Sequence, residues 1–105
     1  MSAAFRGSPA PLAALHHQGN QLLAGGTTAF HKRLTSLRGR PVVINEGASW
    51  CEPCQSEFPV FQKAAGKYGR RIAFLGVDSR DEDPAARAFL KRFPVSYPSY
   101  TDPDK

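Results

Sequence analysis

Two short runs of apolar residues constrain the fold of this chain more than any other feature. The first run is Pro41–Asn45, and the second is Arg71–Asp78. Such nearly continuous apolar runs, rich in β-branched residues, are typical of buried parallel strands. Between the runs, a helix is predicted to extend to about Tyr68, because several residues have the spacing of one buried helical face: Phe58, Phe61, Ala64, Ala65 and Tyr68. The order strand, helix, strand is a βαβ unit, which predicts a parallel pair of strands with a right-handed crossover.

The segments on both sides of this unit predict three more helices and one more strand. Leucines at roughly helical spacing predict a helix over residues 11–24. A second helix is expected to begin at a cap formed by Thr27 or Thr28, and a third at a cap formed by Asp83. Alternating residues in the segment 97–101 predict a short edge strand.

The length of 105 residues corresponds to about one small domain. We divide the chain into a flexible lead-in over residues 1–10, an N-terminal helical segment over 11–40 and an α/β domain over 41–105. Hydrophobic residues make up 41% and charged residues 22%, which is ordinary globular composition. No apolar run approaches the ~18 residues that a transmembrane helix needs, so the composition excludes that class for this chain.

The chain is basic, with 14 Lys and Arg residues against nine acidic ones and a net charge of +5. The basic residues come as short scattered pairs without interleaved aromatic residues, so nucleic-acid binding is disfavoured and a solvated surface is the better account. The basic surface could still bind an anionic membrane or an acidic partner, and the sequence does not decide between the two. The first five residues lack the apolar core of a signal peptide. Either the protein is cytosolic, or this sequence begins after a removed targeting segment.

The segment Cys51-Glu52-Pro53-Cys54 lies where the first predicted strand leads into a helix. Free N–H groups and the helix dipole stabilise a thiolate at a helix N-terminus. The pKa of Cys51 is therefore expected to lie below the ~8.5 of a free thiol. Cys54 comes one turn later and is expected to be more buried. Cys51 would therefore attack a partner, and Cys54 would resolve the mixed disulfide.

Other interpretations of the cysteine pair fit the sequence less well. A zinc site normally needs four ligands, and no second pair of cysteines or suitably spaced histidines completes one. A haem attachment site would need His directly after Cys54, where Gln55 stands. The interpretation of the pair as an inert structural disulfide remains an alternative. His16, His17 and His31 are interpreted as surface or helix residues, so we predict no metal and no cofactor besides the redox-active cysteines themselves.

Ala48-Ser49-Trp50-Cys51-Glu52-Pro53-Cys54 followed by Glu57-Phe58-Pro59 resembles the thioredoxin-like thiol–disulfide oxidoreductases of the TlpA/ResA-like branch. The resemblance covers residues 41–105. It implies a thioredoxin-like βαβ core and a location outside the bacterial cytoplasm, in a branch that includes reductases of apocytochrome c.

The resemblance also implies a role for each residue around the pair. Cys51 would be the nucleophile and Cys54 the resolving thiol. Glu57 would influence the acid–base behaviour of the cysteines, because a nearby carboxylate raises thiol pKa values or shuttles a proton. Trp50 would pack beside the pair and Pro53 would tune its potential. Glu52 is expected to be exposed and to oppose thiolate formation modestly.

The sequence departs from the family pattern in two places. Glu46-Gly47 stands where the family has bulky residues, and we expect loosened packing there, with an extra acid–base group as the alternative. The chain also ends before the usual C-terminal hairpin and helix. In the family, a cis-proline precedes that hairpin. Pro98 could be this proline, but the turn residues 102–104 better fit the additional strand that the TlpA-like branch inserts before it. With the hairpin lacking, we expect the strand that begins at Pro41 to have an open edge, and the chain to form a homodimer through it or to be a fragment of a longer protein.

The sequence thus predicts an oxidoreductase that exchanges a dithiol for a disulfide with partner proteins, as a reductase that is recharged by an upstream reductant. One alternative is a redox-inert thioredoxin-like interaction module or an inactive fragment. Another is metal handling by the thiol pair. The loop Arg80–Asp83 is interpreted as solvated rather than catalytic.

Overall fold

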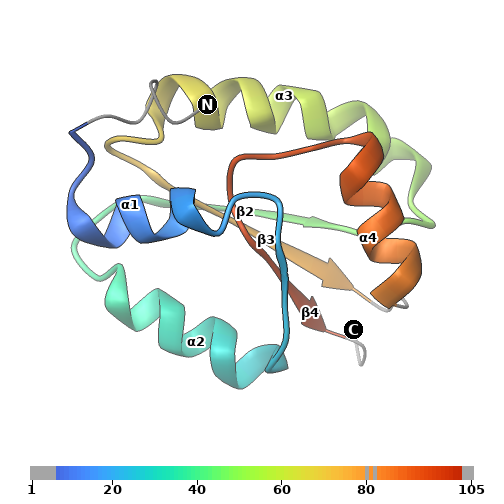
Figure 1. Ribbon diagram of the computed structural model, residues 1–105, viewed down its shortest axis with the longest axis horizontal. Coiled ribbons are helices and arrows are strands. Elements are labelled where there is room, and N and C mark those ends of the chain that lie inside the picture. Colours follow the sequence, from blue (N-terminus) through green and yellow to red (C-terminus); the bar gives the residue numbers. More distant parts are fainter. Residues whose placement is uncertain (1–6, 80, 82, 103–105) are drawn as a thin grey trace.

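A computed structural model describes residues 7–79, 81 and 83–102 of the chain. These residues form an α/β fold of four helices and four strands (Figure 1). The elements in chain order are α1 (Ala10–His17), β1 (Leu22–Leu23), α2 (Gly26–Ser36), β2 (Val42–Gly47), α3 (Glu52–Tyr68), β3 (Ala73–Ser79), α4 (Asp83–Arg92) and β4 (Ser99–Asp102). The predicted fold class is confirmed.

All four strands are parallel and lie in the order β1-β4-β3-β2. The pair predicted from the two apolar runs is β2 and β3, which are in register from Val42 opposite Ala73 to Gly47 opposite Asp78. Because the strands are parallel, their carboxyl ends lie at one edge of the sheet. The turn that precedes Cys51 begins at this edge, directly after β2.

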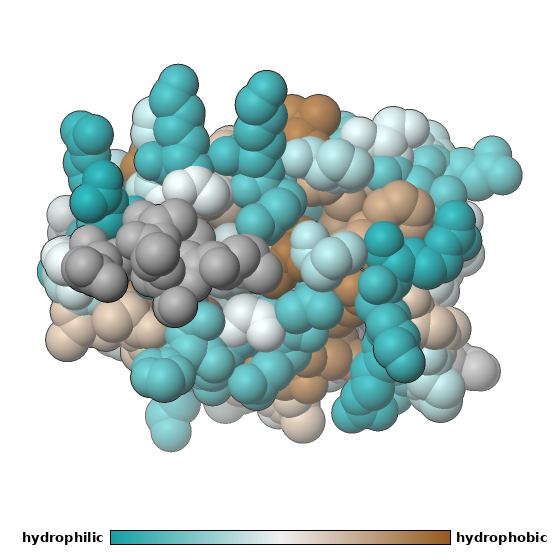
Figure 2. All heavy atoms as spheres, turned by 45° about the horizontal axis from the view of Figure 1, so that its top comes forward, coloured by the Kyte–Doolittle hydropathy of each residue, from teal (hydrophilic) through white to brown (hydrophobic). Residues whose placement is uncertain are grey.

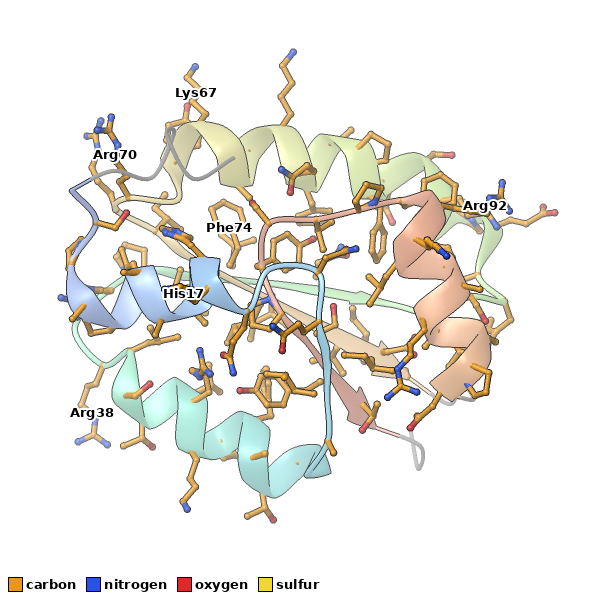
Figure 3. All side chains as sticks on the ribbon, in the orientation of Figure 1. His17, Arg38, Lys67, Arg70, Phe74 and Arg92 are labelled. Carbon is orange, nitrogen blue, oxygen red and sulfur yellow. A yellow bond between two sulfur atoms is a disulfide. The ribbon has the colours of Figure 1, made fainter. Side chains whose placement is uncertain are left out.

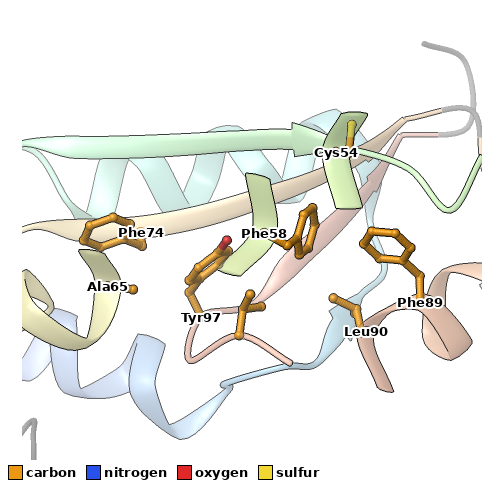
Figure 4. Packing of buried hydrophobic residues seen from close by; sticks show 8 residues of the cluster. Cys54, Phe58, Ala65, Phe74, Phe89, Leu90 and Tyr97 are labelled. Carbon is orange, nitrogen blue, oxygen red and sulfur yellow. The ribbon is translucent and has the colours of Figure 1, made fainter. Parts of the chain in front are cut away.

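Helices cover both faces of the sheet, each over its own hydrophobic core. On one face, α3 and α4 pack over Phe74 of β3 (Figure 4). On the other face, α1 and α2 pack over Ala73 and Leu75, the two residues that flank Phe74 in β3. This alternation follows from the period of two along a strand and fixes which strand residues face the cysteines.

The helix predicted over residues 11–24 is shorter than expected. α1 ends at His17, and Leu22 and Leu23 form β1, which pairs with β4. The physical reason lies at Asn20, which has a positive φ of 63°. Its amide donates to the carbonyl oxygen of Leu90 at 3.1 Å and accepts from the N–H of Val95 at 2.9 Å, so the chain turns there towards the sheet.

The second helix also begins earlier than predicted. Gly25, with a φ of 104°, is the residue before the first turn of α2, so neither Thr27 nor Thr28 caps this helix. The third predicted helix begins at Asp83. Of the lead-in predicted over residues 1–10, residues 1–6 lie outside the described part of the chain.

The prediction of an edge strand over residues 97–101 was wrong. β4 lies between β1 and β3, and its residues Ser99 and Tyr100 are buried. Gly76 makes this position possible, because a Cβ at that residue would overlap the Ser99 hydroxyl oxygen. β4 is also parallel to its neighbours, as an inserted strand would be, and no peptide bond among the described residues is cis. Pro98 therefore does not occupy the place of the family's cis-proline.

In the described residues β1 and β2 are the two edge strands of the sheet, and β2 pairs with β3 alone. Ile44 in the middle of this strand is 45% exposed. The expectation that the strand beginning near Pro41 has an open edge is confirmed for the described part of the chain. Within the same part, no helix has both the length and the apolar composition to cross a membrane.

Candidate active site

Cys51 and Cys54 form a disulfide at the N-terminus of α3, with their Cα atoms 5.3 Å apart. The local sequence explains this placement. Cys51 is the N-cap residue, its sulfur accepts a hydrogen bond from the N–H of Cys54 at 3.3 Å, and Pro53 lies in the first turn, where its missing N–H costs little. A tight turn precedes the helix, in which the N–H of Cys51 donates to the carbonyl oxygen of Ala48 at 3.1 Å.

The two cysteines differ in burial. Cys54 is 8% exposed and belongs to the core beneath α3 and α4 (Figure 4). Cys51 is only partly buried. The ring of Phe58 lies one turn beyond Cys54 in α3 and stacks edge-on against Phe89, with ring centroids 4.8 Å apart. A protein partner can therefore reach the sulfur of Cys51 more readily than that of Cys54.

Gly47 lies directly beneath the disulfide in the sheet. A Cβ at this residue would be 3.0 Å from the Cε1 atom of Phe58 and 3.6 Å from the Cys54 sulfur. The expectation of loosened packing at Glu46-Gly47 was wrong, because the Phe58 ring and the Cys54 side chain occupy the space that a larger residue would fill. Glu46 points to the other face, where it is exposed and accepts a hydrogen bond from the Ser79 hydroxyl at 3.0 Å.

Trp50 precedes Cys51 and is 63% exposed. Its indole Nε1 donates to the carbonyl oxygen of Ser79, the last residue of β3, at 3.2 Å. The hydrogen bond fixes one edge of the ring, while most of the ring surface stays available to solvent or to a partner. The sequence prediction that Trp50 accompanies the cysteine pair is consistent with this position.

Ser49 and Asp81 connect the turn before Cys51 to the segment after β3. One Asp81 carboxylate oxygen accepts from the N–H of Ser49 and the other from its hydroxyl, both at 2.7 Å. Both Asp81 oxygens thus act as acceptors. The interpretation of Arg80–Asp83 as a merely solvated loop does not hold for Asp81; Arg80 and Glu82 lie outside the described residues.

Asp78 adds a second carboxyl group beside Asp81. It is half-buried near the end of β3, opposite Gly47 of β2. Burial, the hydrogen bond to Asp81 and the negative charges of Asp81 and Asp83 together raise the pKa of Asp78 from 3.8 to about 8, with burial the largest cause. Asp78 is therefore the protonated member of the pair at neutral pH.

The other predicted site residues lie on the surface of α3. Glu52 and Pro53 in its first turn are exposed, and so is Glu57, one turn after Cys54. Figure 2 views the side of the molecule that carries α3, where hydrophilic side chains surround smaller hydrophobic patches. The structure thus brings Trp50 and the two cysteines together, and the predicted roles of Glu52, Pro53 and Glu57 stay predictions.

Sequence reasoning did not single out Ser49, Asp78 or Asp81. A signal for them was present, since Asp78 ends the second apolar run and the first run ends just before the cysteines. The carboxyl ends of parallel neighbours lie at the same edge of a sheet, so residues that follow both runs must be close together.

Among the predicted non-site residues, His16 lies with its Nε2 atom 3.0 Å from the carbonyl oxygen of Gly69. No group of three metal-ligating side chains occurs in the part of the chain that the structure describes.

Comparisons with known proteins agree with this geometry. The model of the AhpC/TSA family matches residues 7–105. The thioredoxin-like protein YneN of Bacillus subtilis is 28% identical over 72 residues, which are 66% of this chain and 42% of that protein. The thiol-disulfide oxidoreductase ResA of the same organism is 29% identical over 73 residues, or 69% and 41% of the two chains.

A further relative is the thiol:disulfide interchange protein DsbE of Pseudomonas fluorescens, 36% identical over 61 residues, which are 58% of this chain and 33% of that protein. The chain thus spans about two fifths or less of the length of these relatives. The resemblance noted in the sequence is confirmed by these names, and the family match extends over most of the chain. The chain belongs to the AhpC/TSA family of thioredoxin-like proteins.

Proposed function

We propose that this protein is a thiol–disulfide oxidoreductase that acts through Cys51 and Cys54. The observation that carries the proposal is the disulfide at the N-terminus of α3, with one sulfur partly exposed and the other buried. A helix N-terminus stabilises the thiolate that forms on reduction, and the thiolate is the attacking species in disulfide exchange. The relatives named ResA and DsbE support the same reaction class.

The exchange proceeds in two steps that balance in atoms and electrons. In the reduced protein, the Cys51 thiolate attacks one sulfur of a partner's disulfide; a bond forms between the proteins, and the other partner sulfur leaves as a thiolate. The Cys54 thiol then loses its proton and attacks the Cys51 sulfur, which restores the Cys51–Cys54 disulfide and releases the second partner thiolate. Two electrons have passed to the partner, whose thiolates take up protons from solvent. An upstream dithiol reductant returns the protein to its reduced form.

Glu57 is the proposed proton acceptor for this second step. It lies in α3 one turn after Cys54, the thiol that must lose a proton. A carboxylate at this distance along a helix can act directly or through one water molecule. Trp50 is proposed to contact the partner with its exposed ring, Pro53 to tune the reduction potential, and Glu52 to oppose the Cys51 thiolate.

The charge around the disulfide favours the reducing direction and a basic partner segment. Carboxylates gather at the edge of the sheet that carries the cysteines: Glu46, Glu52, Glu57, Asp81 and Asp83. Figure 3 shows Arg38, Lys67 and Arg70 projecting at the opposite end of the molecule, and Arg92 projecting at the end where α3 begins. Negative charge destabilises a thiolate and so destabilises the reduced form, which makes a dithiol a better reductant. Negative charge also attracts a positively charged polypeptide.

Two further points follow from the family resemblance and the sheet. We place the protein outside the cytoplasm, as in the branch that it resembles, and cell fractionation with an antibody against it would test this location. We also propose that β2 pairs with β2 of a second copy, because β2 is the longer of the two edge strands of the described sheet. Size-exclusion chromatography with light scattering should give a dimer; a monomer at high concentration would contradict this.

Reduction of insulin disulfides by the protein with dithiothreitol tests the proposed function. Wild type should accelerate the reaction, Cys51→Ser should be inactive, and Cys54→Ser should stop at a mixed disulfide that is visible on a non-reducing gel. The matched control is Ser56→Ala, an exposed change in the same helix that leaves the sulfurs in place. Equal rates for wild type and Cys51→Ser would overturn the proposal and favour a redox-inert binding module.

A further inference from the structure

The turn that carries Cys51 is held from outside by the last residue of β3 and by the segment that follows it. Three hydrogen bonds cross between them: two from Ser49 to Asp81 and one from Trp50 to the carbonyl oxygen of Ser79. The residues at the two ends of these bonds are about 30 positions apart in the sequence, so the contact is a tertiary one.

Asp78 is connected to the same contact through Asp81, with which it shares a hydrogen bond. Both Asp81 oxygens accept hydrogen bonds from Ser49, and the hydrogen bond between the two carboxyls raises the pKa of Asp78, as expected when Asp78 is the donor. Two carboxyl groups in direct contact hold one proton between them, because both cannot ionise without strong repulsion. Removal of that proton places two negative charges against each other beneath the turn.

Few other groups act on Asp78. Its register partner in β2 is Gly47, which has no side chain, and its partner in β4 is the uncharged Thr101. From α3, Cys54 packs over Gly47, and in the disulfide form it does not titrate. From the loop and α4, the charged groups are Asp81 and Asp83, and both are negative. No described cation is among the groups that shift this carboxyl.

We propose that Asp78 and Asp81 share one proton and act as a positioning pair, which holds the turn at Ser49 and Trp50 so that Cys51 faces its partner, and which releases the turn when the proton is lost. Neither carboxyl touches the reacting sulfurs in this account. The pair acts on exchange only through the turn. The effect of the pair on disulfide exchange rests on the proposed function, whereas its effect on the position of the turn does not.

Trp50 allows the proton to be followed directly, because it is the single tryptophan of the chain and lies in the turn. In the oxidised protein the cysteines do not titrate, so no thiol contributes to the signal. Tryptophan emission of the oxidised wild type should show a transition with a midpoint near pH 8. Asp78→Asn, which keeps a donor towards Asp81, should abolish this transition. Asp81→Asn should shift it downwards by one pH unit or more, because the neighbouring charge is removed.

The matched control is Glu46→Gln, which removes a carboxylate that also contacts Ser79 but on the other face of the sheet. This variant should keep the wild-type transition. Far-UV circular dichroism establishes that each variant is folded, and the two Asp variants test the pair independently. Absence of a wild-type transition between pH 7 and 9, or its persistence unchanged in Asp78→Asn, would overturn the inference.

A second readout connects the pair to exchange. Asp81→Ala removes both acceptors of Ser49, and the rate of insulin reduction at pH 7 should fall about tenfold, since a small displacement of a reacting group has effects of this size or larger. Asp81→Asn retains one side-chain acceptor and should recover part of the rate. An unchanged rate in an active Asp81→Ala protein would overturn the positioning role. If wild type itself lacks activity, the proposed function fails, while the fluorescence experiment still decides whether the pair holds the turn.

Discussion

Gly47 offers the sharpest test of the packing beneath the disulfide, because two opposite outcomes are physically reasonable. If the space at Gly47 were loose, Gly47→Ala would fill it and stabilise the protein, by about 0.5–1 kcal/mol, through lower entropy of the unfolded chain. In the structure, the new Cβ would lie 3.0 Å from Cε1 of Phe58, while ordinary contacts begin at about 3.4 Å. The ring cannot move away freely, because it packs against Phe89 at 4.8 Å between centroids.

We therefore expect Gly47→Ala to lower the free energy of unfolding by about 1 kcal/mol, and Gly47→Val by about 2–3 kcal/mol, as in other overpacked cores. The matched control is Gly66→Ala in α3, where a Cβ meets no atom within 4 Å and which should stabilise the helix by about 0.5–1 kcal/mol. Urea unfolding of the oxidised proteins, followed by circular dichroism, measures all three. A Gly47→Ala protein that is more stable than wild type would refute the reasoning.

Three other predictions concern stability. Tyr97→Phe leaves the buried amide of Asn45 without the hydroxyl to which it donates at 3.0 Å, so urea unfolding should show a loss of about 1–3 kcal/mol, and no loss would contradict it. Because the pKa of Asp78 is raised from 3.8 to about 8, the native state binds this proton more tightly, and stability should fall as pH rises through that window. The free energy of unfolding of Asp78→Asn should therefore rise relative to that of wild type between pH 5 and 8. A difference between the two proteins that stays constant over this range would count against the prediction. Burial lowers the pKa of His16 below its ordinary value of 6.5, so the contribution of the neutral imidazole to stability is present above pH 6.5 and is lost as the pH falls below it. In the same unfolding experiment, the stability of His16→Gln should fall less in acid than that of wild type.

The parts of the fold that depend on local pattern could be predicted from the sequence. The runs that begin at Pro41 and Arg71 form β2 and β3, and the helix between them ends at Tyr68 as its spacing indicates. Buried strands in a βαβ unit are continuous in apolar residues, and a helix face repeats every three to four residues. The cysteine pair could also be placed, because a strand-to-helix junction fixes where the helix N-terminus lies.

The parts that depend on contacts between distant residues could not. Leu22 and Leu23 are compatible with a helix or a strand, and only their pairing with β4 decides between them. The segment after Tyr97 has the composition of an edge strand, yet β1 covers its outer side, and the small Gly76 admits Ser99 on its inner side. Two-residue strands carry too little local signal for such an arrangement to be found without the structure.

The same limit applies to the candidate site. The sequence places Cys51 and Cys54 together because they are three residues apart, whereas Asp81 lies 32 residues from the Ser49 that it binds. The residues around Asp81 have the composition of a solvated turn, and only the shared edge of β2 and β3 brings Asp81 next to Ser49. Gly47 was interpreted as a loss of packing because its own side chain is absent; the Phe58 ring that replaces it comes from another element.

The account depends most directly on the difference in reactivity between the two sulfurs. Reduced protein at pH 7 is treated with less than one equivalent of iodoacetamide, and tandem mass spectrometry of the peptide that contains both cysteines locates the label. Because Cys51 is the partly exposed residue at the helix N-terminus and Cys54 is 8% exposed in the core, we predict that almost all of the label is on Cys51. Equal labelling of the two residues, or preferential labelling of Cys54, would contradict the account.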